Sequence, residues 1–378
     1  MSISQATMLW DVKSARSVHY QVVSSENLFD IGNDHILGRG FRQTPEKRRC
    51  LIVIDTNVFK LYGKSIAMYF AHHAVEIELI KLTVSESEKV IDSVLAIVSA
   101  LNEFGISRQG EPLMGIGGGI LLDIVGMAAS LYRRGISYIR VPTTLIGLID
   151  AGIGIKTGVN FDLYKSRLGT YCPPLVAYLD RSFLKTLDQR HMSNGLAEIL
   201  KLALVKDGRL FELMESNIEG LIFDRLQGST EYDEIFQRAV TGMIEELETN
   251  LWEDDLNRRM DFGHSFSPSL EMNALPELLH GEAVNIDMVF SMLLALGRGF
   301  LLRQDFERVL KVMRNLHLPV THKLCNLRFM QNALDEVTKH RNGLRLPLNV
   351  GIGDCTFVND IVSTELQSAV SLMQDMGL

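Results

Sequence analysis

Several features are scarce in this sequence of 378 residues, and each scarcity excludes a class of protein. The formal charge of -8 comes without any basic block, so the chain lacks the electrostatic surface expected of a nucleic-acid-binding protein. Four cysteines without a CxxC pair argue against a disulfide framework or a thiolate zinc site, and they favour a reducing cytoplasm. The N-terminus has no apolar run after a basic start, and the later apolar runs are too short for a bilayer. We therefore expect no export and no membrane partner.

What the sequence does contain is an alternation of strand and helix patterns in its first half. Runs such as "RCLIVIDTNV", "VEIELIKLTV" and "SYIRVPTT" alternate with helical segments, which is typical of parallel βαβ units with helices on both faces. From about Asp188 the apolar segments lengthen, and strand signals nearly vanish until "LRLPLNVGIG". We therefore expect a Rossmann-like α/β domain over residues 1–184 and a helical domain over residues 185–378.

A glycine-rich turn in "MGIGGGILLDIVGMAAS" is the first candidate ligand site. Gly118 and Gly119 follow a predicted strand and precede a helix, where backbone amides can face a phosphate or pyrophosphate. A plain tight turn is the alternative, because the spacing is not GxGxxG. Asp55, at the end of another strand, could accept hydrogen bonds from a ribose or could cap a helix. Thr143 and Thr144 supply hydroxyls at a third strand end.

A carboxylate, a lysine and two histidines form the second candidate site. Glu198 and Lys201 share one face of a predicted apolar helix, where they could form an ion pair or could serve a ligand. His264 and His280 stand in "DFGHSF" and "LHGEAVN", and each is next to a glycine. Either histidine alone would be read as a core or capping residue. Together with Glu198 they make a two-histidine, one-carboxylate set that suits Zn²⁺ and leaves room for substrate oxygens.

The segment "DAGIGIKTGVNFDLYKSRLG" concentrates charged and amide side chains, namely Asp150, Lys156, Asn160, Lys165 and Arg167. A solvated loop would explain this composition. A polyol phosphate also requires such a mixture of anion-binding cations with hydroxyl-binding acids and amides.

In order along the chain, "GIGGGILLDIVGMAAS", "VPTTLIGLIDAGIGIKTGVN", "NGLAEILK", "DFGHSFSP" and "HGEAVN" resemble the sugar phosphate cyclase superfamily, whose best-known member is dehydroquinate synthase. The resemblance implies an NAD⁺-binding N-terminal domain, a helical C-terminal domain that binds Zn²⁺ or Co²⁺, a sugar phosphate substrate and a homodimer. The implied metal ligands are Glu198, His264 and His280. The implied catalytic positions are Arg134, Asp150, Lys156, Lys201, Asp261 and His340. The implied cofactor positions are Asp55, Asn57, Glu86, Lys89, Gly118, Gly119, Asp123, Thr143, Thr144 and Lys165.

The departures from the dehydroquinate synthase pattern concern the groups that hold a substrate carboxylate. The family's arginine and asparagine before the first metal histidine are replaced by Asn257 and Asp261. Further departures stand at Met243, Ser166, Pro268 and His340. Fewer cations and an added acid disfavour an anionic carboxylate and favour a neutral polyol. The pattern therefore resembles the 2-epi-5-epi-valiolone synthase branch, which cyclises sedoheptulose 7-phosphate.

The branch implies a redox-neutral reaction in which NAD⁺ takes a hydride, phosphate is eliminated and the hydride is then returned, after which the ring opens and an intramolecular aldol reaction closes the carbocycle. Four alternatives stay open: a 2-epi-valiolone or desmethyl-4-deoxygadusol synthase, a 3-dehydroquinate synthase, an iron-type NAD-dependent dehydrogenase, and a catalytically silent binding protein.

Overall fold

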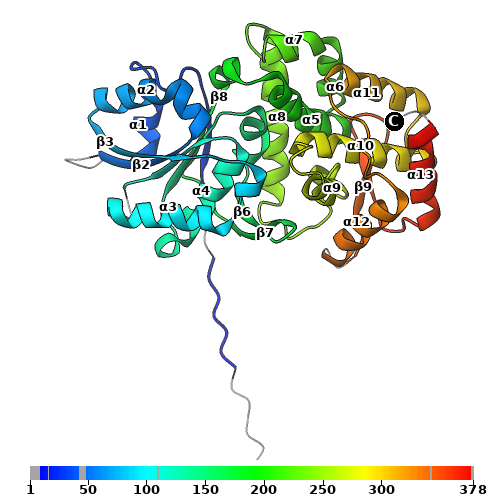
Figure 1. The fold of residues 1–378 in the computed structure, drawn as a ribbon, viewed down its shortest axis with the longest axis horizontal. Helices are drawn as coiled ribbons and strands as arrows, with labels where there is room; N and C mark the ends of the chain where they lie inside the picture. Colours follow the sequence, from blue (N-terminus) through cyan, green and yellow to red (C-terminus); the bar gives the residue numbers. More distant parts are fainter. Residues whose placement is uncertain (1–8, 16, 42–47, 109, 341–342, 376–378) are drawn as a thin grey trace, which may run out of the picture.

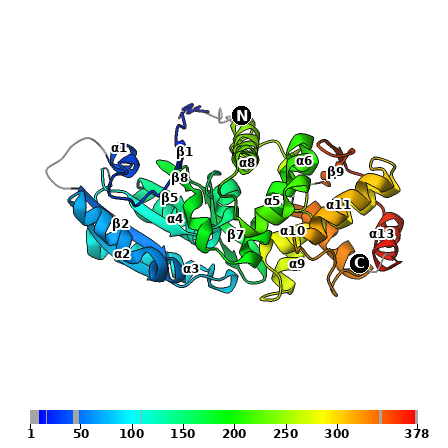
Figure 2. The ribbon, with the colours of Figure 1, turned by 90° about the horizontal axis from the view of Figure 1, so that it is seen from above.

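The computed structural model describes residues 9–15, 17–41, 48–108, 110–340 and 343–375, except for the side chain of residue 340. Figures 1 and 2 show an α/β half and a helical half side by side along the longest axis of the molecule. Within the described residues, no helix has both the length and the apolar character needed to cross a membrane.

The α/β half is built on a six-stranded sheet in the order β1-β8-β5-β4-β2-β3. Every neighbouring pair is parallel, as the strand and helix alternation predicted. The strands are β1 Gln21–Ser25, β2 Arg48–Asp55, β3 Val75–Leu82, β4 Leu113–Gly117, β5 Tyr138–Pro142 and β8 Val176–Asp180. The edge strand β1 was not predicted, because its five residues have a mostly half-exposed pattern.

Helices cover both faces of this sheet because successive residues of its strands point to opposite sides. In β2, Leu51 and Val53 pack with α3 and α4, whereas Ile52 and Ile54 pack with α1 and α2. The helices are α1 His35–Gly40, α2 Thr56–His72, α3 Ile91–Phe104 and α4 Gly119–Leu131. Short 3-10 turns at Glu86–Glu88, Tyr132–Arg134 and Arg181–Thr186, and a π-turn at Gly147–Ala151, connect these elements.

A two-stranded hairpin stands where the sequence was read as a charged, glycine-containing stretch. Strands β6 Lys156–Phe161 and β7 Tyr164–Tyr171 are antiparallel, with an irregular register near the turn. The inner residues of β6 are buried, whereas most of β7 is exposed. The hairpin lies at the junction of the two halves (Figure 1).

The helical half surrounds two helices that are buried on all sides. Helix α5 is buried from Met192 to Val205 and α10 from Gly281 to Ala295, as expected of core helices. The helices are α5 Gln189–Val205, α6 Gly208–Ser216, α7 Ile218–Phe223, α8 Thr230–Thr249, α9 Ser267–Asn273, α10 His280–Gly297, α11 Arg303–Asn315, α12 Leu327–His340 and α13 Ser363–Asp375. A 3-10 turn at Arg259–Asp261 precedes α9. Strands β9 Leu346–Asn349 and β10 Cys355–Val358 form a small antiparallel sheet at the predicted strand signal.

Candidate active site

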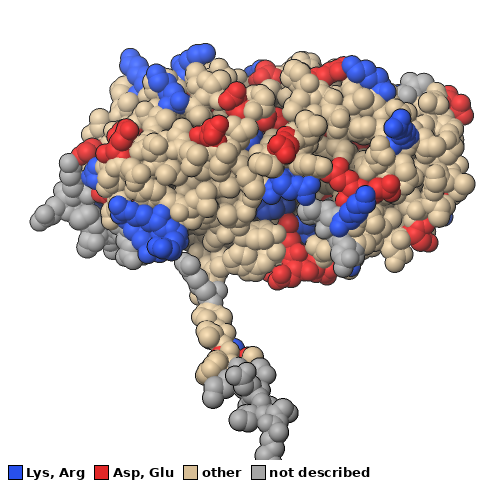
Figure 3. All heavy atoms as spheres, turned by 60° about the horizontal axis from the view of Figure 1, so that its bottom comes forward, with Lys and Arg blue, Asp and Glu red and all other residues tan. Residues whose placement is uncertain are grey.

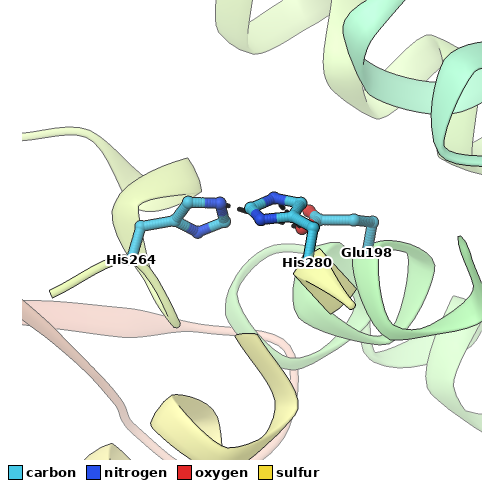
Figure 4. A group of neighbouring side chains, drawn as sticks. All are labelled: Glu198, His264 and His280. Carbon is cyan, nitrogen blue, oxygen red and sulfur yellow. Dashed lines mark ion pairs between the residues drawn. The ribbon is translucent and has the colours of Figure 1, made fainter. Parts of the chain in front are cut away.

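Glu198, His264 and His280 meet although they come from three separate elements. Glu198 lies on the buried helix α5, His264 on the loop before α9, and His280 is the first residue of α10. One ligand atom from each residue lies within 4.8 Å of the others. The Nε2 atoms of His264 and His280 are 3.8 and 3.4 Å from Oε1 of Glu198. Figure 4 shows the three side chains pointing toward one another.

The protonation of His264 and Glu198 suits a divalent cation. Burial, together with the charge of Lys201, holds the pKa of His264 well below its usual value, so the ring is neutral. Its Nδ1 lies 3.2 Å from the carbonyl oxygen of Phe262, which can accept a hydrogen bond from Nδ1–H, and this tautomer leaves a lone pair on Nε2. Burial alone would raise the pKa of Glu198, but Lys201 and both histidines hold it well below the usual value. Both carboxylate oxygens of Glu198 are buried: Oε1 faces the two histidines and Oε2 faces Lys201. Two imidazoles and a buried carboxylate therefore fit Zn²⁺ or Co²⁺.

His280 is oriented by a second buried carboxylate. Its Nδ1 lies 2.9 Å from Oε2 of Glu271 and 2.8 Å from Nζ of Lys165, and Lys165 also contacts Glu271 at 2.5 Å. We assign the Nδ1 proton to a hydrogen bond with Glu271, because Lys165 already has this carboxylate as its acceptor. Burial would raise the pKa of Glu271, but Lys165 and His280 lower it further than burial raises it. The arrangement is the carboxylate–histidine pair that commonly orients metal ligands, and it leaves Nε2 facing Glu198.

Lys201 and Asp150 adjoin this cluster. Nζ of Lys201 lies 2.6 Å from Oε2 of Glu198, and both side chains are buried. Burial raises the pKa of Asp150, and the nearby charges of Lys201 and Glu198 act on it in opposite directions. An ammonium group and an acid with raised pKa therefore stand within electrostatic range of the candidate metal position.

Lys156 and Asp261 belong to a chain of ion pairs whose other two members were not predicted. Nζ of Lys156 lies 2.9 Å from Oε1 of Glu253, and Glu253 also pairs with Arg258. Arg258 grips Asp261 through two guanidinium nitrogens, at 2.7 Å and 3.1 Å. The charge of Asp261 is therefore balanced within the chain. Glu253 and Arg258 were missed because only the fold brings them to Lys156.

The predicted cofactor residues fall into two groups at the carboxyl ends of the strands. In the first, Asp55 caps α2: its Oδ1 accepts hydrogen bonds from Asn57 N at 2.7 Å and Val58 N at 3.1 Å. Asp55 can therefore cap α2 and also accept a hydrogen bond from a ribose, because its Oδ2 takes no part in the cap. Gly118 and Gly119 begin α4, and a Cβ on Gly118 would approach Thr144 Cγ2 at 3.0 Å.

Thr143 is the strongest sign of a ligand at this edge. Its Oγ1 is buried and has no hydrogen-bond partner within the described residues. Oγ1 of Thr144 instead accepts a hydrogen bond from Gly147 N at 3.2 Å.

The second group joins the 3-10 turn before α3, helix α4 and the hairpin. Lys89 is buried, and its Nζ lies 2.6 Å from Oδ2 of Asp123 and 3.2 Å from Oγ of Ser166. Glu86 accepts a hydrogen bond from Nδ2 of Asn160 at 2.8 Å. Lys165 was assigned to the cofactor, and the structure places its Nζ against His280 and Glu271, beside the candidate metal centre.

One predicted residue lies far from the glycine-rich turn, and the side chain of another lies outside the described residues. Arg134 is exposed in the turn after α4, about 20 Å from Gly119 at the other end of this helix by the rise of 1.5 Å per residue. His340 is the last residue of α12, and its side chain lies outside the described residues.

A surface cleft of about 560 Å³ opens between β7 and α12. It is lined by Tyr164, Arg167, Asn332, Asp335, Glu336 and Lys339. Figure 3 shows acidic and basic side chains interspersed over the face drawn, with a group of basic side chains near its middle.

Comparison with known proteins gives matches over almost the whole chain. The family models for the 3-dehydroquinate synthase N-terminal and C-terminal regions match residues 79–194 and 195–340. A 2-epi-5-epi-valiolone synthase of an Actinomyces species is 50% identical over 97% of this chain and 98% of its own. The demethyl-4-deoxygadusol synthase of Trichormus variabilis is 36% identical over 98% of this chain and 92% of its own.

A solved structure agrees with these matches. The 2-epi-5-epi-valiolone synthase of Streptomyces hygroscopicus subsp. jinggangensis, with NAD⁺ and Zn²⁺ bound, is 50% identical and superimposes with a TM-score of 0.93 over 97% of this chain and 100% of its own. Because the family models and full-length relatives cover both halves, the chain belongs to the dehydroquinate synthase-like family of sugar phosphate cyclases.

Proposed function

We propose that this protein is a 2-epi-5-epi-valiolone synthase, a carbon–oxygen lyase that converts sedoheptulose 7-phosphate to the cyclitol 2-epi-5-epi-valiolone and phosphate. The observation that carries the proposal is the full-length similarity, at 50% identity, to a protein of that name. The convergence of Glu198, His264 and His280 in a buried cluster supports it, because the chemistry requires a metal beside the substrate hydroxyls.

The proposed metal ligands are Glu198, His264 and His280, and NAD⁺ would lie along the strand ends near Asp55, Thr143 and the N-terminus of α4. When bound, NAD⁺ supplies reversible hydride transfer, and Zn²⁺ or Co²⁺ supplies polarisation of a substrate hydroxyl. The amide groups at the start of α4 favour a pyrophosphate, and the unpartnered hydroxyl of Thr143 can donate to a cofactor oxygen.

The remaining residues would bind and orient the sugar phosphate. Lys156 is 64% exposed and can move from Glu253 toward a phosphate. Lys201 would stabilise an oxyanion beside the metal, and Asp150, with its raised pKa, would exchange protons with a substrate hydroxyl. Asp261, held by Arg258, would accept a hydrogen bond from a substrate hydroxyl.

We further infer that the protein works as a cytoplasmic homodimer. The four free cysteines suit a reducing compartment. Arg134 follows the far end of α4, about 20 Å from the glycine-rich turn, so as a phosphate ligand it would serve the site of a second copy.

The test is to incubate the purified protein with sedoheptulose 7-phosphate, NAD⁺ and Zn²⁺ or Co²⁺. Phosphate release, NADH absorbance and the NMR spectrum of the product are followed together. The expected result is phosphate release without accumulation of NADH, with 2-epi-5-epi-valiolone as the product. Another cyclic product would assign a 2-epi-valiolone or desmethyl-4-deoxygadusol synthase.

Two other outcomes would replace the proposal. Stoichiometric NADH would indicate a net dehydrogenase. Turnover only of the carboxylated heptulosonate phosphate would indicate a 3-dehydroquinate synthase. A His264→Ala variant serves as the metal-site control, with His191→Ala, an exposed histidine at the start of α5, as the matched surface control.

A further inference from the structure

The loop that carries His264 is fitted closely onto α10. Gly263 has a φ of +74°, and a Cβ there would lie 2.8 Å from Cγ of Met288 and 2.9 Å from Cγ1 of Val284. Oγ of Ser267 donates a hydrogen bond to the carbonyl oxygen of Gly263 at 2.6 Å, which closes the loop. These contacts therefore restrict the backbone on both sides of His264.

One buried carboxylate of α10 holds the residues that follow His264. Oδ2 of Asp287 accepts backbone hydrogen bonds from Ser265 at 2.8 Å, Phe266 at 2.5 Å and Ser267 at 2.8 Å. Its Oδ1 accepts a hydrogen bond from the hydroxyl of Ser291 at 3.1 Å. Asp287 is 0% exposed, in a helix whose neighbouring residues are largely apolar. A carboxylate in such surroundings is costly unless it is fully hydrogen-bonded, and these four donors supply that compensation.

These contacts are an unusual way to begin a helix. Helix α9 has no side-chain cap of its own, since its N-cap residue is Phe266. The acceptor for its first backbone amides is instead a side chain of α10. The start of α9 and the His264 loop are therefore held in position by α10. A local serine or aspartate cap would have satisfied the amides without fixing this position.

The same helix also carries the other histidine. His280 and Asp287 are seven residues apart on α10, which places them on one face, two turns from each other. We propose that Asp287 is a positioning residue of the metal centre: α10 supplies His280 directly and, through Asp287, sets the position of His264. This inference rests on the proposed metal site of Glu198, His264 and His280.

The test compares Zn²⁺ affinities of full-length variants by competition with a chromogenic chelator. Asp287→Asn keeps the shape but loses the charge that compensates three amides, so we expect Zn²⁺ affinity to fall about 10- to 100-fold, as for other groups that orient metal ligands. Ser291→Ala is the matched control, because it removes only the contact to the other carboxylate oxygen, and its affinity should stay within about twofold of wild type. The visible spectrum of the Co²⁺-substituted protein should change in Asp287→Asn and not in Ser291→Ala.

A double-variant cycle separates positioning from a general loss of stability. If Asp287 acts through His264, then Asp287→Asn should change the residual Zn²⁺ affinity of His264→Ala by less than about twofold. Equal losses in both backgrounds would overturn the inference, and so would a wild-type affinity and Co²⁺ spectrum in Asp287→Asn. Asp287→Ser is made in parallel. If neither variant folds, the inference is also overturned, because the carboxylate of Asp287 would then be needed for folding and not specifically for the metal centre. The proposed metal site itself fails only if His264→Ala binds Zn²⁺ as wild type does.

Discussion

Replacement of Lys201 by methionine tests how much the positive charge of Lys201 stabilises Glu198 in the candidate metal centre. Lys201 Nζ lies 2.6 Å from Glu198 in a buried pair, so the variant leaves a buried carboxylate without its counterion. Breaking such a pair costs about 3–5 kcal/mol. The carboxylate can instead take up a proton, and doing so at a pH near 7.5, about 3 units above its ordinary pKa of 4.5, costs about 4 kcal/mol. We therefore expect metal-free Lys201→Met to be about 3–4 kcal/mol less stable, or roughly 4–5 °C lower in Tm for a chain of 378 residues.

Added Zn²⁺ should reverse most of this loss, because the metal replaces the missing positive charge beside Glu198. The assay is thermal unfolding of chelator-treated protein, with and without excess Zn²⁺. Lys206→Met is the matched control: it makes the same substitution at the end of the same helix, in a surface pair with Glu246 at 2.8 Å, worth at most about 1 kcal/mol. The reasoning is refuted if metal-free Lys201→Met melts with wild type, or if Zn²⁺ stabilises both proteins equally.

Three further predictions concern the groups around the site. Glu271→Gln should weaken Zn²⁺ binding about 10-fold, because the amide holds the His280 ring less firmly, and an unchanged affinity by chelator competition would contradict that role. In Asp123→Asn, Lys89 loses its buried partner, so the free energy of unfolding in urea should fall by about 3 kcal/mol. The Kd for NAD⁺, measured by calorimetry, should rise in this variant. An NAD⁺ Kd equal to that of wild type would exclude Asp123 from the cofactor cleft. Metal removal by a chelator should lower Tm, and Zn²⁺ at 100 times its Kd should restore about 2.7 kcal/mol, whereas a Tm unaffected by Zn²⁺ would argue against the site.

The sheet and the site were predictable from the sequence to different extents. The strand "LIVID" could be recognised because it is buried on both faces and followed by a helix pattern. The hairpin β6–β7 was not, because its outer strand is exposed and carries charges where a strand signal needs alternating apolar residues. The residues Lys156 and Lys165 were singled out, but the elements that hold them were not.

The side chains that hold the predicted site residues in position were harder to predict than the site residues themselves. His264 and His280 stood out because each is next to a glycine in an apolar segment, whereas Glu271 and Asp287 look like ordinary acids on helices. The function of Asp287 depends on three backbone amides about 20 positions earlier in the chain, and no side-chain pattern encodes backbone amides. Long-range hydrogen bonds of this kind follow from the packing of α9 on α10, which only the folded structure provides.

The charges around the site indicate an order of binding. The connected group of Asp150, Glu198, Lys201, Lys156, Glu253, Arg258 and Asp261 continues through Glu198 to His280, Glu271 and Lys165. Its acidic and basic groups nearly balance before a metal binds, because the pKa of His280, which burial alone would lower, is raised to about 9 beside Glu271 and Glu198. A bound divalent cation adds positive charge, so a sugar phosphate is attracted more strongly after the metal has bound. Titration of inorganic phosphate into metal-free and Zn²⁺-loaded protein would show this order as tighter binding to the loaded form, and equal affinity would argue that the more distant Lys156 alone determines phosphate binding.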